Sequence, residues 1–168
     1  MAVVAADSTD GPHIRMSGSP RILLLRRDNI GDLVCTTPLI AALRAQLPAA
    51  WLGAVVTTYN AEVLRRTGAA APIPVDTADL KTLIAALSVA DRVICPDGGA
   101  MHLAAALGKP VVALFGDSPV ERWRPWGVPH CIVRPESRIL ADLPLEPVLD
   151  AFHELQDRFL RQSSPVRP

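Results

Sequence analysis

Short apolar runs of strand length alternate along the chain with segments whose apolar residues recur at helical spacing. Strands are predicted at 21–25, 51–56, 73–75, 92–95, 111–115 and 130–133. Helices are predicted at 37–47, 60–66, 100–107 and 145–160, and from a cap at Asp76 or Thr77 to residue 90. Strands that alternate with helices of about ten residues form parallel βαβ units. The pattern therefore predicts an α/β fold with a doubly wound, mainly parallel, Rossmann-like sheet of five or six strands.

The two ends of the chain differ from its middle. Residues 1–19 are rich in Gly, Ser, Pro and Asp and lack periodicity, and residues 163–168 have the same character. Both ends are therefore predicted to be flexible tails. Because 168 residues suffice for one ordinary domain, we expect a single α/β domain over residues 20–162.

Composition and charge exclude several classes of protein. Hydrophobic residues make up 49% and charged residues 20% of the chain, which argues against global disorder. The 17 basic and 17 acidic residues give a formal net charge of zero, so we expect no nucleic-acid partner. No apolar run approaches the roughly 20 residues of a transmembrane helix, and the N-terminus lacks the features of a signal peptide. Cys35, Cys95 and Cys131 form no CxxC pair, so a reducing compartment without a zinc site fits best.

The first candidate site lies between the predicted strand at 21–25 and the helix that follows. It contains Arg26, Arg27, Gly31 and Asp32. Gly31 permits close backbone approach or a positive φ, and a helix start beside two arginines suits a diphosphate. Asp32 would repel phosphate, and could instead deprotonate an incoming hydroxyl as a general base. The alternative is structural: Asp32 caps the helix, Gly31 makes a turn and the arginines face solvent.

The second candidate site follows the predicted strand at 92–95. Gly98 and Gly99 let the backbone wrap an anion, with N–H groups that open the next helix. His102 lies about one turn into that helix and can point back at the same ligand. Asp97 could accept hydrogen bonds from a sugar or ribose hydroxyl, but Asp97 and His102 without a third ligand make a poor metal site. The alternative is a common DGG turn with a structural histidine.

The third candidate site follows the predicted strand at 111–115. Gly116 ends that strand at the same sheet edge, and Trp123 and Trp126 follow among arginines. These residues could stack a base, hold a saccharide or lie at a membrane surface. The alternative is a proline-fixed loop whose aromatic side chains cap the core.

Together these segments resemble the heptosyltransferase family, glycosyltransferase family 9, shortened by an internal deletion. The run RILLLRRDNIGDLVCTTPLIAALRAQLP resembles the family's N-terminal motif of a strand, a GD turn and a helix. The run ADRVICPDGGAMHLAAALGKPVVALFGDSPVERWRPWG resembles its C-terminal signature D-x-G-x-x-H-x-A-x-A-x-G-x-P-x-x-x-L-F-G. Residues 20–68 would then come from the family's N-terminal half, and residues 72–162 from its C-terminal half.

The resemblance implies a shortened relative of the GT-B fold, in which two Rossmann-like domains face each other. It implies inverting transfer of a sugar, typically heptose from ADP-heptose, to a lipopolysaccharide or other saccharide acceptor, without a metal or other cofactor. By motif, Asp32 corresponds to the general base, and Asp97, Gly98, Gly99 and His102 correspond to the loop that binds the nucleotide sugar. Many members have Thr where this chain has Gly98.

Further contacts with phosphate or with the acceptor would come from Arg26, Gly31, Gly116 and Trp123. The resemblance also implies a bacterial, cytoplasmic enzyme of lipopolysaccharide biosynthesis. Its lipid-linked acceptor would bring it into peripheral contact with the inner face of the cytoplasmic membrane.

The chain departs from the family between its two motifs. The stretch that normally separates them has no counterpart here, so the cleft between two domains cannot form in the usual way. A homodimer would rebuild that cleft, or the two parts would join in one sheet with Asp32 and Asp97 along one carboxyl edge. Two hypotheses follow: an active glycosyltransferase, or an inactive remnant that acts at most as a nucleotide-sugar-binding module.

Overall fold

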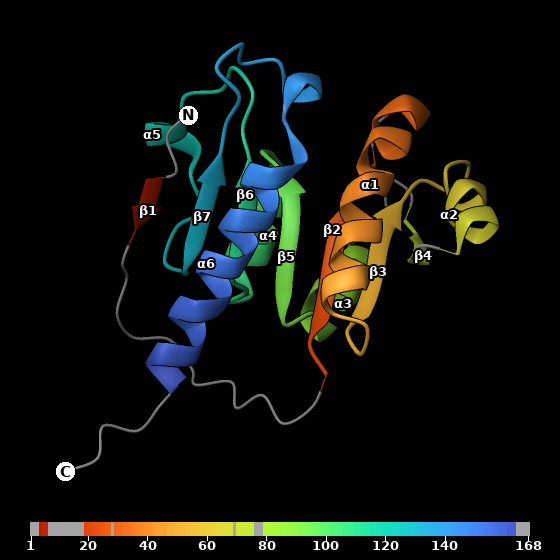
Figure 1. The fold of residues 1–168 in the computed structure, drawn as a ribbon, viewed down its shortest axis with the longest axis horizontal. Coiled ribbons are helices and arrows are strands. Elements are labelled where there is room, and N and C mark those ends of the chain that lie inside the picture. Colours follow the sequence, from red (N-terminus) through yellow and green to blue (C-terminus); the bar gives the residue numbers. More distant parts are fainter. Residues whose placement is uncertain (1–3, 7–18, 28, 69, 76–78, 164–168) are drawn as a thin grey trace.

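The computed structural model describes residues 4–6, 19–27, 29–68, 70–75 and 79–163, and side chains only within 19–158 of these ranges. Strands and helices alternate along the chain, as the apolar pattern predicts (Figure 1). The strands are β1 (Val4–Ala6), β2 (Arg21–Leu25), β3 (Trp51–Val56), β4 (Ala71–Pro74), β5 (Arg92–Pro96), β6 (Val111–Leu114) and β7 (His130–Val133). The helices are α1 (Ile30–Gln46), α2 (Ala61–Thr67), α3 (Leu80–Val89), α4 (Gly99–Ala106), α5 (Val120–Trp123) and α6 (Leu145–Ser163), with a 3-10 turn η1 at Leu140–Asp142.

All of these strands belong to one sheet in the order β1-β7-β6-β5-β2-β3-β4. The strands from β2 to β7 are parallel to their neighbours, and Leu24 of β2 lies between Ala54 of β3 and Ile94 of β5. The parallel strands therefore have the spatial order of a Rossmann-type sheet. This confirms the predicted α/β class and the doubly wound sheet, which β1 extends by pairing antiparallel with the edge of β7.

Two apolar cores lie on opposite faces of the sheet because successive strand side chains point to opposite faces. Helices α1, α2 and α6 cover the face that is in front in Figure 1, and α3 and α4 cover the face behind. The front core packs Ile40 of α1 and Phe152 of α6 against Ile94, and all three side chains are buried. The rear core contains Leu87 of α3 and Met101 of α4. Burial of this apolar surface is what holds the helices against the sheet.

Helix α1 begins at Ile30, well before the start predicted at residue 37. The predicted start was too late because proline is unusual inside a helix. Pro38 lies inside α1, where it lacks the N–H that would bond the Val34 carbonyl. The Thr37 hydroxyl donates to that same carbonyl at 2.7 Å. The side chain thus replaces the missing backbone donor, and the helix continues through the proline.

The other differences are short elements or lie at element ends. The strand Val4–Ala6 falls within the predicted tail at 1–19, of which residues 1–3 and 7–18 are outside the described residues. Helix α5 was not predicted. The predicted cap at residues 76–77 also lies outside the described residues, and α3 instead follows Asp79, whose carboxylate accepts from the Thr82 N–H at 3.0 Å.

The last helix, α6, places its apolar face on the sheet as predicted. Val148, Phe152 and Leu155 are buried and Leu149 is half-buried, whereas the side chain of Phe159 lies outside the described residues. Among the described helices, none has the length and apolar character required to cross a membrane.

Candidate functional site

The centre of the sheet contains a point at which the chain connections diverge. From β2 the chain passes through α1 on the front face to β3, whereas from the adjacent β5 it passes through α4 on the rear face to β6. The loops that follow β2 and β5 therefore separate at the carboxyl ends of two neighbouring strands. Open α/β sheets bind their ligands in the crevice that such a divergence creates.

The loop after β2 holds an ion pair between Arg26 and Asp32. The Arg26 Nη2 atom lies 3.4 Å from Asp32 Oδ1, and its Nε–H donates to the Asp32 carbonyl at 3.3 Å. The Arg26 side chain is 11% exposed and that of Asp32 is 32% exposed. The guanidinium therefore holds the carboxylate in place while one side of it remains open to solvent.

The structural alternative for this loop is wrong in two respects. Asn29 is the N-cap residue, and Asp32 lies in the first turn of α1, where its N–H donates to the Asn29 carbonyl at 3.1 Å. Gly31 is helical and does not have a positive φ, and a Cβ on it would meet no described atom within 4 Å. As far as the described residues show, the space beside Gly31 is open, which leaves its backbone accessible to a ligand.

The loop after β5 is shaped by Gly98, the N-cap of α4. Its φ of 145° and ψ of −176° lie in a region that essentially only glycine occupies. The carbonyl of Gly98 accepts from the N–H groups of Met101 and His102, and Gly99 begins the helix. The first N–H groups of a helix have no acceptor within it, so this start of α4 can bind an anion.

His102 and Trp123 bring the second and third predicted segments together. Their ring centroids lie 6.2 Å apart in an edge-to-face arrangement, and the Arg122 guanidinium carbon lies 4.9 Å from the centroid of the Trp123 ring. Trp123 is 42% exposed and Trp126 71% exposed. These exposed side chains therefore do not cap the core, and the Trp123 ring lies against His102 of α4.

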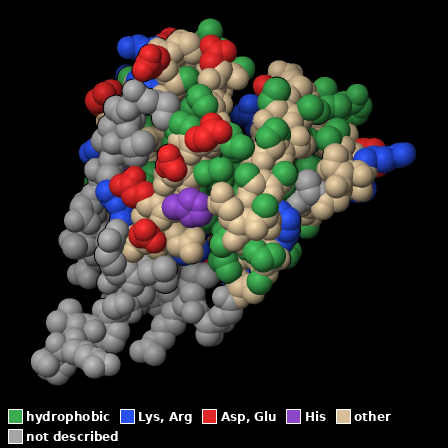
Figure 2. Space-filling view, viewed as in Figure 1, with side chains coloured by type: hydrophobic (Ala, Val, Ile, Leu, Met, Phe, Trp, Pro, Cys, Tyr) green, Lys and Arg blue, Asp and Glu red, His purple; other side chains and the backbone are tan. Residues whose placement is uncertain are grey.

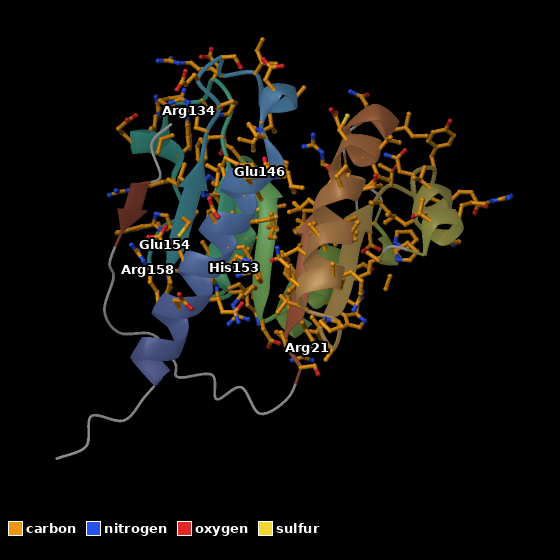
Figure 3. The ribbon with its side chains drawn as sticks, viewed as in Figure 1. Arg21, Arg134, Glu146, His153, Glu154 and Arg158 are labelled. Carbon is orange, nitrogen blue, oxygen red and sulfur yellow. The ribbon has the colours of Figure 1, made fainter. Side chains whose placement is uncertain are left out.

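Gly116 is held by the segment that follows β7. The Arg134 Nε–H donates to the Gly116 carbonyl at 2.8 Å, and a Cβ on Gly116 would lie 3.1 Å from the Arg138 carbonyl oxygen. Figure 3 shows Arg134 at the end of the sheet where the parallel strands finish, and Arg21 at the opposite end. The chain itself thus packs against Gly116.

A pocket of about 190 Å³ opens at the same edge, on the front face. It lies between α1 and the segment that leads into α6, where the surface in Figure 2 is hollowed. Arg26 and Asp32 line this pocket, and on the side of β5 it reaches Pro96. The other lining residues are Leu24, Leu25, Cys35, Thr36, Pro38, Leu39, Ile94, Leu114, Leu140, Ala141, Leu143, Pro144, Leu145 and Val148.

The predicted site residues therefore fall into two groups. Arg26 and Asp32 line the pocket on the front face. Asp97, Gly98, Gly99 and His102 do not line it, and His102 instead contacts Trp123 on α5, whose first residue packs on the rear core. The two groups share the carboxyl edge of adjacent strands but are not joined by this pocket.

Sequence reasoning missed the wall of the pocket formed by η1 and the start of α6. The apolar residues Leu140 and Leu143 lie there in a stretch without strand or helix periodicity, and Leu145 follows as the first residue of α6. Their one signal was an apolar character that is unusual for a surface loop. Thr36 was also missed, and its hydroxyl donates to the Asp32 carbonyl at 2.8 Å.

The cysteines differ in accessibility. Burial, together with the negative charge of Asp97, raises the pKa of Cys95 to about 12. Burial raises the pKa of Cys131 to about 11. Cys35 is exposed and lines the pocket. Within the described residues, no cluster of three or more His, Cys, Asp or Glu side chains is arranged to hold a metal ion.

Comparison with protein families gives one match. Residues 75–143 match the model of glycosyltransferase family 9 (heptosyltransferase). A comparison with curated proteins finds no significant match.

Several solved structures share the fold. The ADP-heptose lipopolysaccharide heptosyltransferase II of E. coli superposes with a TM-score of 0.65 at 17% identity, covering 89% of this chain and 49% of that chain. The E. coli heptosyltransferase WaaC with ADP-2-deoxy-2-fluoro heptose gives a TM-score of 0.62 at 19% identity, covering 82% and 44%. UDP-GlcNAc 2-epimerase from Neisseria meningitidis gives 0.60 at 15% identity, covering 90% and 40%. At these identities the likeness establishes the fold, and the chain spans about half the length of the heptosyltransferases it matches.

Proposed function

We propose that this chain transfers a sugar from a nucleoside diphosphate sugar. The proposal proceeds from the match of residues 75–143 to glycosyltransferase family 9 (heptosyltransferase). The proposed donor is of the ADP-heptose type. The reaction inverts the anomeric configuration, and the resemblance makes the acceptor a lipopolysaccharide or another saccharide.

The observation that carries this proposal is the position of both motifs at one divergence point. The first motif follows β2 and the second follows β5, and these strands are paired neighbours in the sheet. When donor and acceptor are bound together in the crevice between the two loops, the donor diphosphate can contact the start of α4 and the acceptor can contact Asp32.

In the proposed reaction, the acceptor hydroxyl oxygen attacks the anomeric carbon from the face opposite the diphosphate. The new C–O bond forms while the bond from that carbon to the diphosphate oxygen breaks, and the nucleoside diphosphate leaves with the electron pair. The hydroxyl proton passes to the Asp32 carboxylate, which Arg26 holds in position. N–H groups at the start of α4 stabilise the negative charge of the leaving diphosphate.

A transfer assay with ADP-heptose tests the role of Asp32. We expect Asp32→Asn to lower the rate by about 10²- to 10⁴-fold, because the amide cannot accept the proton. The matched control is Asp157→Asn, an exposed aspartate on α6 that lines no part of the pocket, and its rate should equal that of the parent chain. Equal rates for Asp32→Asn and the parent would show that Asp32 is not the base.

A second candidate function is binding of a nucleotide sugar without catalysis. The observation in its favour is that the pocket beside Asp32 is not lined by Asp97, Gly98, Gly99 or His102. Saturable binding of ADP together with no transfer to any acceptor would favour this module over the enzyme.

The proposed transfer needs no metal, so the rate of sugar transfer should be unchanged by EDTA. The enzyme is proposed to act at the cytoplasmic face of the membrane. It is proposed to act as a homodimer if both copies are needed to complete the cleft. A change in rate that Mg²⁺ restores would contradict the metal-independent reaction, and sedimentation at the assay concentration would settle the assembly state.

A further inference from the structure

The pocket beside Asp32 has an apolar wall. Apart from Arg26, Asp32, Cys35 and Thr36, every described residue that lines it is Ala, Val, Leu, Ile or Pro. The strand ends of β2, β5 and β6 form its floor, and η1 with the start of α6 forms the opposite wall. An acceptor that reaches Asp32 through this pocket must therefore place most of its surface against hydrocarbon.

The polar groups of the pocket already bond to one another. Arg26 pairs with the Asp32 carboxylate and donates to the Asp32 carbonyl, and the Thr36 hydroxyl donates to the same carbonyl at 2.8 Å. A saccharide that entered this pocket would lose the water bonded to its hydroxyls and find few new partners. Burial of a polar group without a hydrogen bond is unfavourable, so the pocket selects against a sugar ring.

The volume limits the size of the occupant. Typical pockets for drug-sized ligands measure roughly 300–1,000 Å³, whereas this pocket measures about 190 Å³. A cavity of about 150 Å³ lined by Leu, Ile and Phe side chains is known to bind benzene. The pocket beside Asp32 therefore accommodates one ring or a short alkyl chain.

We propose that this pocket binds the apolar aglycone of an alcohol acceptor and places its hydroxyl at the Asp32 carboxylate. This inference rests on the proposed transfer and changes its acceptor from a saccharide to a hydrophobic alcohol. The alcohol oxygen forms the new bond to the anomeric carbon, its proton passes to Asp32, and the nucleoside diphosphate leaves with the electron pair of the broken bond.

The Cys35 thiol provides a reporter that does not depend on catalysis. Cys35 lines the pocket and is exposed, whereas Cys95 and Cys131 are buried. The aromatic disulfide DTNB should therefore modify one thiol in the native protein. Benzyl alcohol serves as the probe, and methyl α-glucoside serves as a saccharide control that also carries hydroxyl groups.

We expect benzyl alcohol to slow modification of Cys35 at least fivefold in a saturable manner, and methyl α-glucoside to leave the rate unchanged. Ala141→Trp, at an exposed lining position, should abolish the dependence on benzyl alcohol. Ala45→Trp, exposed on α1 but outside the lining, should retain it. No protection of the folded protein by benzyl alcohol, or equal protection by the glucoside, would overturn the inference.

Binding of ADP to the same samples separates the two proposals. Saturable binding of ADP without protection by benzyl alcohol would overturn the aglycone pocket alone. Protection by benzyl alcohol without binding of ADP would overturn the proposed transfer, and with it the role of the pocket as an acceptor site.

Discussion

Gly98 has a backbone conformation that decides which residue can stand at the start of α4. At φ 145° and ψ −176° a side chain is strained whatever space surrounds it, because the Cβ conflicts with its own backbone. The family resemblance places Thr at this position in many members. In this chain a Thr would meet the same strain. Gly98 has no side chain, so the loop lacks the hydroxyl that such members carry.

We predict that Gly98→Ala destabilises the protein by about 1 to 3 kcal/mol in urea unfolding. The matched control is Gly99→Ala, because Gly99 is helical and a Cβ on it would meet no atom of the described residues within 4 Å. Alanine favours a helix over glycine, so this control should be neutral or stabilising by up to about 1 kcal/mol. Equal effects of the two substitutions would contradict the conformation described for Gly98.

His130 is a buried titratable group away from the candidate site. Its Nδ1–H donates to the Val128 carbonyl at 2.8 Å, and within the described residues Nε2 has no hydrogen-bond partner. Burial lowers the pKa of His130 below its ordinary value of 6.5, and the positive charges of Arg124 and Arg158 act in the same direction. The folded protein therefore favours the neutral imidazole more strongly than the unfolded chain does.

This gives a pH dependence of stability with a defined sign. As the pH falls below about 6.5, the unfolded chain binds a proton at this histidine before the folded protein does. The contribution to stability is fully present above that pH, and it is lost as the pH falls toward the lowered pKa of the folded state.

We predict that His130→Asn, which keeps a donor for the Val128 carbonyl but does not titrate, loses less stability than the parent between pH 7.5 and pH 5. Urea unfolding at both pH values measures the difference. A parent-like pH dependence in His130→Asn would contradict the lowered pKa.

For the candidate site residues, the sequence predicted their places in the fold but not the side chains that they contact. Arg26 and Asp32 were expected beside a helix start and line a pocket there. The ion pair between them was not predicted, because the phosphate interpretation assigned the arginine to a ligand instead of a neighbouring side chain. The Trp123 contact with His102 was not predicted either, because it joins residues from two helices and depends on how those helices pack.

The side chain of Thr37 allows helix α1 to continue through its internal proline, Pro38. The Thr37 hydroxyl donates to the Val34 carbonyl, which Pro38 cannot reach because it has no N–H. The same helix presents Asp32, Cys35 and Thr36 to the pocket. Continuity of the helix through the proline therefore determines how these residues are presented.

A double-mutant cycle tests this substitution of a side chain for a backbone donor. We predict that Thr37→Val costs about 0.5 to 1.5 kcal/mol of unfolding free energy, the usual net value of one hydrogen bond. In a Pro38→Ala background the backbone N–H is restored, so the same substitution should cost close to nothing. An equal cost in both backgrounds would show that the Thr37 hydroxyl does not replace the backbone donor missing at Pro38.

The regular elements were predictable where their apolar pattern was strong. The strands β2, β3 and β7 have the predicted bounds, since each is mainly apolar and is followed by a polar residue, Arg26, Thr57 or Arg134. The edge strand β1 and the helix α5 are too short to produce a period. The segment at 140–144 has no regular pattern, and its position over the pocket depends on tertiary packing, with Leu143 against the front core.

At the level of the complete molecule, the alternation of strands and helices was sufficient to predict the doubly wound sheet. It could not predict that the two sequence motifs would follow adjacent strands, since strand order is a property of the tertiary fold. In the structure β2 and β5 are neighbours. This adjacency places both motifs at one edge in a chain that spans about half the length of the heptosyltransferases it matches.

Calorimetric titration of the chain with ADP tests whether a nucleoside diphosphate binds where the loops after β2 and β5 diverge, as proposed above. We expect saturable binding that Asp97→Ala and His102→Ala each weaken about tenfold, equivalent to about 1.4 kcal/mol, while the exposed His153→Ala leaves it unchanged. If the folded protein binds none of ADP, UDP and GDP at millimolar concentration, the proposed donor site is wrong and the signature serves the fold alone.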